Sequence, residues 1–116
     1  MKNLTDKPSK SDPTITIYKH RIVLSARACF ILRITESRRV QFGEEGGRHF
    51  IYRPSDGIGY YVNFREGRST GTINDTHLAG ELAYALGGYG VYRITNNISF
   101  SEKMERLFQI ITYALA

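Results

Sequence analysis

The sequence predicts an α+β fold: a small β-rich domain of short, mostly antiparallel strands with two short helices. Its length of 116 residues fits one domain, and its 41% apolar content is enough to fill one core. Short segments rich in β-branched and aromatic residues alternate with turn residues, whereas helical spacing of apolar residues is limited to a few segments. The order strand, helix cap, helix, strand occurs twice, at residues 21–42 and 71–94, so we expect two related units within one domain.

The first unit begins after a polar N-terminal segment. Residues 1–13 mix lysines, aspartates and prolines with one leucine, so we expect a flexible tail that buries too little apolar surface to be ordered. Residues 14–18 and 21–24 are rich in β-branched side chains and predict one bent strand or a tight pair. Ser25 can cap a helix, and residues 26–32 carry apolar side chains on one helical face.

A hairpin is predicted next. Residues 39–42 alternate in polarity, the Glu-Glu-Gly-Gly run at 44–47 can supply the positive φ of a turn, and residues 48–52 form the return strand. The first unit then ends at Arg53, so that the folded domain, residues 14–116, divides into 14–53 and 54–116.

The second unit opens with a turn and a strand. Residues 54–57 carry a Pro-Ser-Asp-Gly turn signal, and residues 59–65 form a strand. A short strand at residues 70–73 leads to a helix capped by Asn74 or Asp75. The apolar residues of that helix recur at helical spacing: Leu78, Leu82, Ala85 and Leu86.

The end of this second helix and the C-terminal segment complete the prediction. A pair of glycines at residues 87–88 ends the helix, and residues 89–94 return as a strand. Residues 104–115 fit both helical spacing and strand composition. We expect a short helical turn over residues 101–106, followed by a strand.

The amino-acid composition excludes several classes of function. The single cysteine, Cys29, excludes an intramolecular disulfide and any zinc site made of several thiolates, which fits a reducing compartment. No apolar leader and no 18-residue apolar run is present, so we expect a cytoplasmic protein with no membrane partner. The net charge of +5 favours an anionic partner.

The positive charge is concentrated in the first unit. Residues 19–53 have a balance of +5, whereas the residues from Pro54 onward have a balance of −1. Most of these cations are arginines, whose guanidinium groups bind phosphate in a bidentate manner. The charge distribution therefore favours recognition of phosphate by the first unit.

Residues 20–42 resemble the DNA-binding element of the AbrB-like (SpoVT/MazE-like) swapped-hairpin family. That element has a basic and apolar strand, a short helix ending in Leu-Gly-Ile, a turn and a strand, and Leu32 and Ile34 match it in spacing. The family commonly has proline where Ser25 stands and glycine where Arg33 stands. The resemblance implies a non-catalytic protein that binds double-stranded DNA, a transcription regulator or antitoxin-like factor that forms a homodimer by exchanging hairpins.

The DNA-binding prediction centres on basic residues at strand ends and turns. Lys19, Arg21, Arg38 and Arg39 are expected to line one surface and contact mainly backbone phosphates. Two further arginines of the first unit complete the predicted set: Arg27 and Arg33.

Two alternatives compete with duplex binding. The arginines can be a solvated face of a protein-interaction or assembly module, in which the repeat forms only an oligomer interface. Binding of single strands is the other alternative, with Tyr60, Tyr61 and Phe64 stacking on bases near Arg65 and Arg68. Packing in the core explains most of these rings, because alternate residues of a strand share one face.

The remaining candidates predict no catalysis, cofactor or metal. The three histidines, His20, His49 and His77, have no metal-ligand spacing. Cys29 sits between apolar residues of a predicted helix and is expected to be a core side chain. The glycines at residues 87–90 follow a helix and lack the Lys-Ser/Thr of a phosphate loop.

Overall fold

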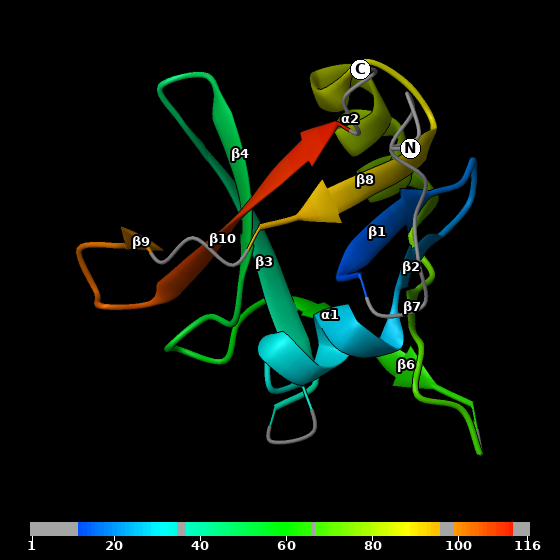
Figure 1. Ribbon diagram of the computed structural model, residues 1–116, viewed down its shortest axis with the longest axis horizontal. Helices are drawn as coiled ribbons and strands as arrows, with labels where there is room; N and C mark the ends of the chain where they lie inside the picture. The colour runs from blue at the N-terminus through cyan, green and yellow to red at the C-terminus, as the bar shows by residue number, and fades with distance from the viewer. Residues whose placement is uncertain (1–11, 35–36, 66, 96–98, 113–116) are drawn as a thin grey trace, which may run out of the picture.

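The fold is seen in a computed structural model that describes residues 12–34, 37–65, 67–95 and 99–112 (Figure 1). Their elements are listed here in chain order: β1 (Thr14–Ile17), β2 (Ile22–Leu24), α1 (Ala26–Ile31), β3 (Arg39–Glu45), β4 (Arg48–Tyr52), β5 (Tyr60–Tyr61), β6 (Asn63–Phe64), β7 (Gly71–Ile73), α2 (Thr76–Leu86), β8 (Gly90–Ile94), β9 (Ser99–Phe100) and β10 (Arg106–Thr112). This confirms an α+β domain of short strands with two helices among the described residues.

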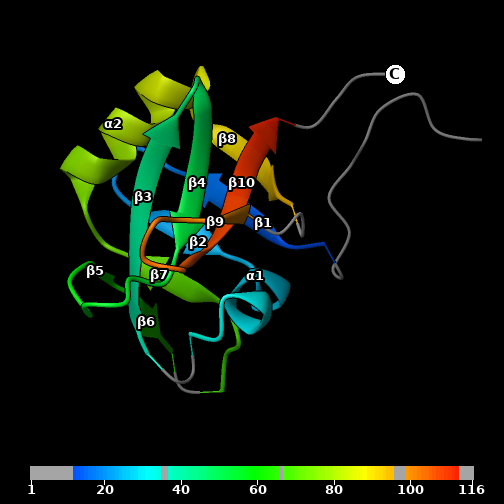
Figure 2. The ribbon, with the colours of Figure 1, turned by 90° about the vertical axis from the view of Figure 1, so that its left-hand side faces the viewer.

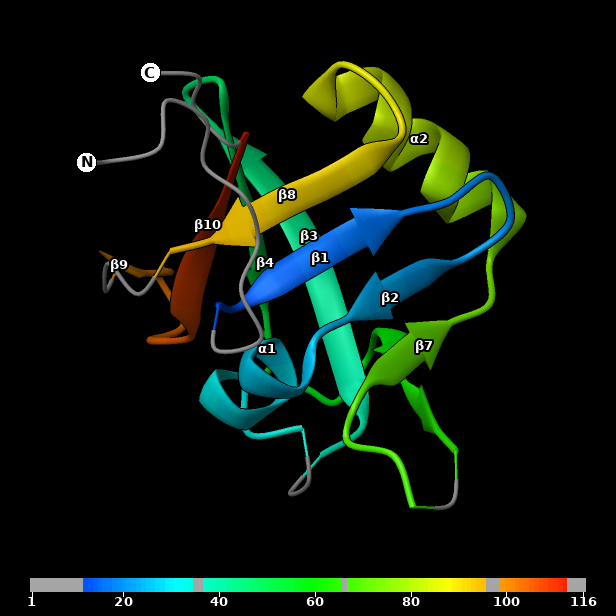
Figure 3. The same ribbon diagram turned by 45° about the vertical axis from the view of Figure 1, so that its right-hand side comes forward.

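The strands form one antiparallel sheet that nearly closes into a barrel. Its order is β5-β3-β4-β10-β8-β1-β2-β7-β6, and β9 pairs with β10. The two ends of this order, β5 and β6, follow each other in the chain across Val62, whose N–H donates to the carbonyl of Arg38 at 2.8 Å. Residues 60–64 therefore lie between β3 and β7, as the turned views show (Figures 2 and 3).

The strand order has an internal two-fold relation. In chain order, β2-α1-β3-β4 of one unit corresponds to β7-α2-β8-β10 of the other, and β1 corresponds to the segment of β5 and β6. The corresponding strands β2 and β7 pair with each other, as do β4 and β10. The pairing of β1 with β8 is matched by that of β5 with β3. Exchanging the two units leaves the order of strands unchanged.

Both helices begin at the predicted caps. The hydroxyl of Ser25 accepts the N–H of Ala28 at 3.2 Å, and the carboxylate of Asp75 accepts the N–H of Leu78 at 2.9 Å. Asp75 is thus the cap, and Asn74 is not. Gly87 ends α2 with φ 101°, in the left-handed region that glycine adopts without steric cost.

The core lies inside the barrel and beneath the helices. Strands of both units contribute inward-facing side chains that are fully buried, among them Ile15, Leu24, Val62 and Ile94. The two helix regions add buried side chains to the core. The first region contributes Ala28, Cys29 and Leu32, and the second contributes Leu78, Ala79, Leu82 and Ala83. Residues 60–64 alternate as predicted, with Tyr60, Val62 and Phe64 packed toward the core and Tyr61 and Asn63 exposed. No described helix has the length and apolar character needed to span a bilayer.

Some local predictions differ from the structure. Residues 101–105 form a turn, closed by a bond of 2.9 Å from the N–H of Met104 to the carbonyl of Ser101, and the expected helical turn is absent there. Strand β10 runs between β4 and β8, so its pairing on both sides outweighs the helical spacing of its apolar residues. Only Gly46 and Gly47 make the hairpin turn, since the preceding glutamates extend β3.

The predicted tail lies mostly outside the described residues. Its last two positions are held in place, because the carbonyl of Asp12 accepts the hydroxyl of Ser25 at 3.1 Å. The carbonyl of Pro13 also accepts the N–H of Ile94 at 2.9 Å. The ordered chain thus starts at least two residues earlier than predicted.

Candidate nucleic-acid interface

The outer surface of β2, β7 and β6 brings the two units together. Val23, Thr72 and Asn63 lie side by side in these strands, with Val23 opposite Thr72 and Thr72 opposite Asn63. Because side chains two residues apart in extended chain share a face, Arg21, just before β2, and Arg65, just after β6, continue this row. Residues more than 40 positions apart thus share one outer face.

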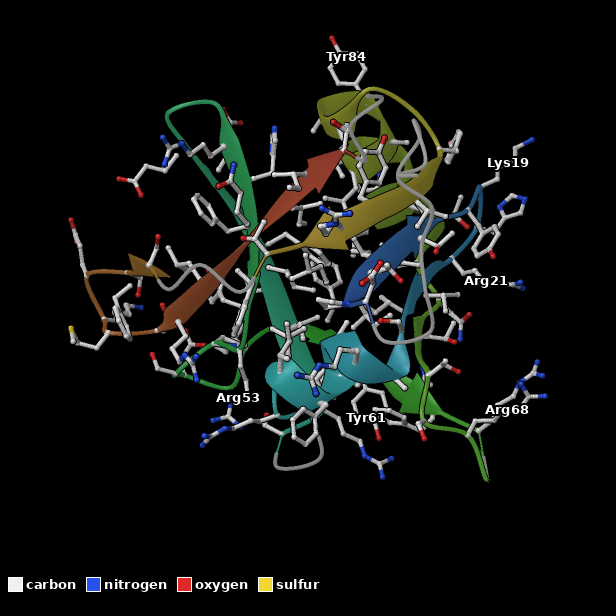
Figure 4. The ribbon with its side chains drawn as sticks, viewed as in Figure 1. Lys19, Arg21, Arg53, Tyr61, Arg68 and Tyr84 are labelled. Atoms are coloured by element: carbon white, nitrogen blue, oxygen red, sulfur yellow. The ribbon has the colours of Figure 1, made fainter. Side chains whose placement is uncertain are left out.

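A groove of about 290 Å³ runs over this face. Three arginines, Arg21, Arg65 and Arg68, line it, and all three are exposed. Its other lining residues are neutral: Val23, Asn63, Phe64, Thr70, Thr72 and Asn74. Figure 4 shows Arg21 and Arg68 pointing away from the barrel on the same side of the molecule (Figure 4).

Two more arginines extend this cationic surface around the barrel. The guanidinium of Arg38 lies over the ring of Phe64, with Cζ 5.4 Å from the centroid, and donates to the hydroxyl of Tyr61 at 3.4 Å. Arg39 lies over the ring of Tyr61 at 5.1 Å and donates to the carbonyl of Gly59 at 3.1 Å. We call the set of five side chains the arginine face: Arg21, Arg38, Arg39, Arg65 and Arg68.

The arginine face keeps its positive charge unpaired within the described part of the chain. There, no Asp or Glu side chain lies within ion-pair distance of its five guanidinium groups. Arg21 instead lies over the ring of Tyr18, with Cζ 4.9 Å from the centroid. A cation stacked on an aromatic ring still exposes its N–H donors at the edge, so these arginines remain able to bind phosphate.

The six predicted DNA-binding residues are distributed over three places. Arg21, Arg38 and Arg39 belong to the arginine face. Lys19 lines a separate shallow depression with residues of α2, although it is close to Arg21 in sequence. Two residues of the helix region, Arg27 and Arg33, lie elsewhere, since Arg27 stacks on Phe30 and Arg33 lines a different cavity.

Sequence reasoning did not assign Arg65 and Arg68 to the same surface as Arg21. The charge balance of the second unit is slightly negative, which hid two arginines that lie at the end of β6 and in the loop after it. The signal that could have found them is the repeat itself, because corresponding strands of two related units often pair across their symmetry axis.

Other reactive groups do not gather at this surface. Burial raises the pKa of the Cys29 thiol to about 11, and its Sγ lies 3.9 Å from the carbonyl of Leu24. Its place on the buried face of α1 confirms the prediction of a core side chain. No cluster of three or more metal-ligating side chains occurs over the ranges that the structure describes.

Comparisons with protein-family models, curated proteins and solved structures give no match to this chain.

Proposed function

We propose that this protein binds double-stranded DNA without catalysing a reaction, as a transcription regulator or antitoxin-like factor, and that the arginine face contacts the phosphates. The observation that carries the proposal is the groove over β2, β7 and β6, which three exposed arginines line and in which no described lining residue is acidic. A guanidinium group that has no carboxylate partner does not have to break an ion pair before it binds phosphate.

Duplex DNA is a better ligand than single strands for this surface, because guanidinium groups cover its aromatic rings. Binding of single strands relies on exposed rings on which bases stack. Here the guanidinium of Arg39 covers Tyr61, and Arg38 covers Phe64, which is itself half-buried. The surface therefore offers N–H donors for phosphates in place of free ring faces.

We further propose that the chain is a fused pair of swapped-hairpin units related to the AbrB-like family. The two-fold order of the sheet supports this, because β2 of one unit pairs with β7 of the other and β4 pairs with β10. Two copies that exchange hairpins would produce the same interleaving of strands. We also propose that two such chains form a homodimer, which light scattering would test.

The alternative, an assembly module, is favoured by one feature. Tyr84 on α2 is 92% exposed and Tyr89 is 56% exposed, and both line the depression that also holds Lys19. Large exposed aromatic side chains are enriched in protein interfaces. In that reading, the arginine face serves solubility alone.

The test is a titration of a random duplex by fluorescence anisotropy at several salt concentrations. We expect binding that falls steeply with salt, because each neutralised phosphate contributes about 0.9 to the slope of log K against log salt. A triple variant, Arg21→Ala with Arg65→Ala and Arg68→Ala, should lose about three such contacts. The matched control is Arg48→Ala, which removes an exposed arginine at the hairpin of β3 and β4.

The outcomes separate the two functions. A reduced slope in the triple variant, with an unchanged slope in the control, supports DNA binding through the arginine face. Absence of duplex binding at low salt favours the assembly module. A loss in the control of about one third of the loss in the triple variant would show that only net charge matters, and the arginine face would then not be the site.

A further inference from the structure

A second cavity lies on another part of the molecule, between the end of α1, the end of β4 and the start of β10. Its volume is about 600 Å³, within the range of small-molecule sites. Figure 4 shows Arg53, one of its lining residues, on the opposite side of the view from Arg21 and Arg68. The cavity is thus separate from the groove of the arginine face.

Four cations from three segments line this cavity: Arg33, Arg53, Lys103 and Arg106. Among the described lining residues, the carboxylate belongs to Glu105, which accepts the N–H of Ser55 at 2.7 Å and the hydroxyl of Ser101 at 2.8 Å. The hydrogen bond from the N–H of Ser55 is the main cause that lowers the pKa of Glu105. This carboxylate is therefore ionised, and its oxygens are already bonded to Ser55 and Ser101. The formal charges of the described lining residues sum to +3.

Two non-glycine residues that line the cavity have a strained backbone conformation that glycine would adopt without strain. Among the described residues, Arg33 with φ 54° and Met104 with φ 63° are the non-glycine residues in the left-handed region, and both line this cavity. At Arg33 the conformation ends α1, since the N–H of Arg33 donates to Phe30 and that of Ile34 to Cys29, each at 3.1 Å. Glycine is the residue that such a helix end favours.

An arginine at this helix end is therefore less favourable for stability than a glycine, which indicates a role for the arginine side chain. Arg53 reinforces the position, because its Nη1 donates to the carbonyl of Arg33 at 3.1 Å. Strained non-glycine residues are concentrated at ligand sites, where the surrounding structure over-determines them. The strain at Arg33 directs a guanidinium-bearing side chain to the wall of a cationic cavity.

Part of the lining is apolar, and Ser37 and Ser55 add polar groups to it. Ile31, Leu32, Pro54 and Phe108 provide this part of the wall, and Arg106 lies over the ring of Phe108 with Cζ 5.4 Å from its centroid. A site that joins cations to an apolar wall fits a ligand that joins phosphate to an apolar or planar group.

We propose that this cavity binds a small organic phosphate, with Arg33, Arg53, Lys103 and Arg106 holding the phosphate and the apolar wall holding the attached group. The inference does not depend on DNA binding, because the two sites share no arginine. Phosphate bound here would also link α1 to β10 across the opening.

The test is calorimetric titration with AMP, glucose 6-phosphate and pyrophosphate, with adenosine and glucose as phosphate-free counterparts. We expect one organic phosphate to bind at a ratio of one to one with a Kd below about 1 mM, and the phosphate-free compounds not to bind. Failure of all three phosphates to bind would overturn the proposal. Pyrophosphate binding more tightly than both organic phosphates would overturn the role of the apolar wall.

The Arg33→Gly variant separates function from folding. Glycine relieves the left-handed strain, so the melting temperature should hold or rise, while loss of the guanidinium should weaken phosphate binding about tenfold. The Arg48→Ala control should bind as the original protein does. Unchanged affinity in Arg33→Gly would remove Arg33 from the site and contradict the proposal.

Discussion

Arg39 and Tyr61 lie directly opposite each other in β3 and β5, and the guanidinium Cζ of Arg39 lies 5.1 Å from the centre of the Tyr61 ring. The pair joins the strand that closes the barrel to the first unit. It also fixes one arginine of the arginine face, because an arginine stacked on a ring has fewer accessible rotamers to lose when it binds.

Arg39→Ala should therefore affect DNA binding more than stability. An exposed cation–π contact contributes about 0.5–1 kcal/mol, and the exposed hydrogen bond to Gly59 adds about 0.5 kcal/mol, so the free energy of unfolding in urea should fall by about 1–1.5 kcal/mol. The salt slope of duplex binding should fall by about one unit if Arg39 contacts a phosphate. An unchanged slope in Arg39→Ala would exclude Arg39 from the interface, whatever the change in stability.

Gly71→Ala should destabilise the barrel. A Cβ at Gly71 would lie 2.4 Å from Cγ1 of Val62 and 3.1 Å from Sγ of Cys29, both in the core. Overpacking of this kind costs about 1–3 kcal/mol, which denaturation in urea measures. Gly80→Ala is the matched control, because a Cβ at Gly80 in α2 would meet no atom within 4 Å and should stabilise the helix by about 0.5–1 kcal/mol. Equal effects of the two substitutions would contradict this account of the closure.

Ser25→Ala should cost more than the loss of an ordinary helix cap. Besides capping α1, the hydroxyl accepts the N–H of Thr14 at 2.9 Å and donates to the carbonyl of Asp12, so it ties the start of β1 to the helix. We expect a loss of about 2 kcal/mol in the free energy of unfolding. Asp75→Ala, which removes a cap with a single such bond, should cost about 1 kcal/mol. A smaller loss in Ser25→Ala than in Asp75→Ala would count against the link to β1.

Cys29 should react with thiol reagents only when the protein unfolds. With a pKa of about 11, roughly one thiol in a thousand is ionised at pH 8, and the side chain is buried on the inner face of α1. Labelling with dithiobis-nitrobenzoate should be slow in buffer and rapid in urea, and its rate in buffer should rise with pH up to the raised pKa. Rapid labelling of the folded protein below pH 9 would show that α1 opens readily.

Much of the fold could be predicted from local sequence. Ser25 marked the first helix start, and the second was narrowed to Asn74 or Asp75. The pair of glycines after Leu86 marked a helix end, and alternation assigned Tyr61 to the outer face. Residues 106–112 were harder, because the pairing of β10 with two neighbours decides its conformation and such pairing has no local signal.

The candidate interface was predicted only in part for the same reason. Arg21, Arg38 and Arg39 came from the resemblance and from local charge. The approach of Arg65 and Arg68 to Arg21 depends on the pairing of β2 with β7 and of β7 with β6. The cavity beside Arg33 could not be foreseen at all, since the backbone conformation of Arg33 appears only in the structure.

The two-fold strand order of a single chain has a consequence for how such a protein diverges. In a dimer of identical subunits, every substitution appears twice, so a surface that gains a charge on one side gains it on the other. Here each half mutates independently, and the position just before β2 is Arg21 while the position just before β7 is Thr70. One two-fold arrangement of strands can thus hold two unlike surfaces, each free to acquire its own ligand.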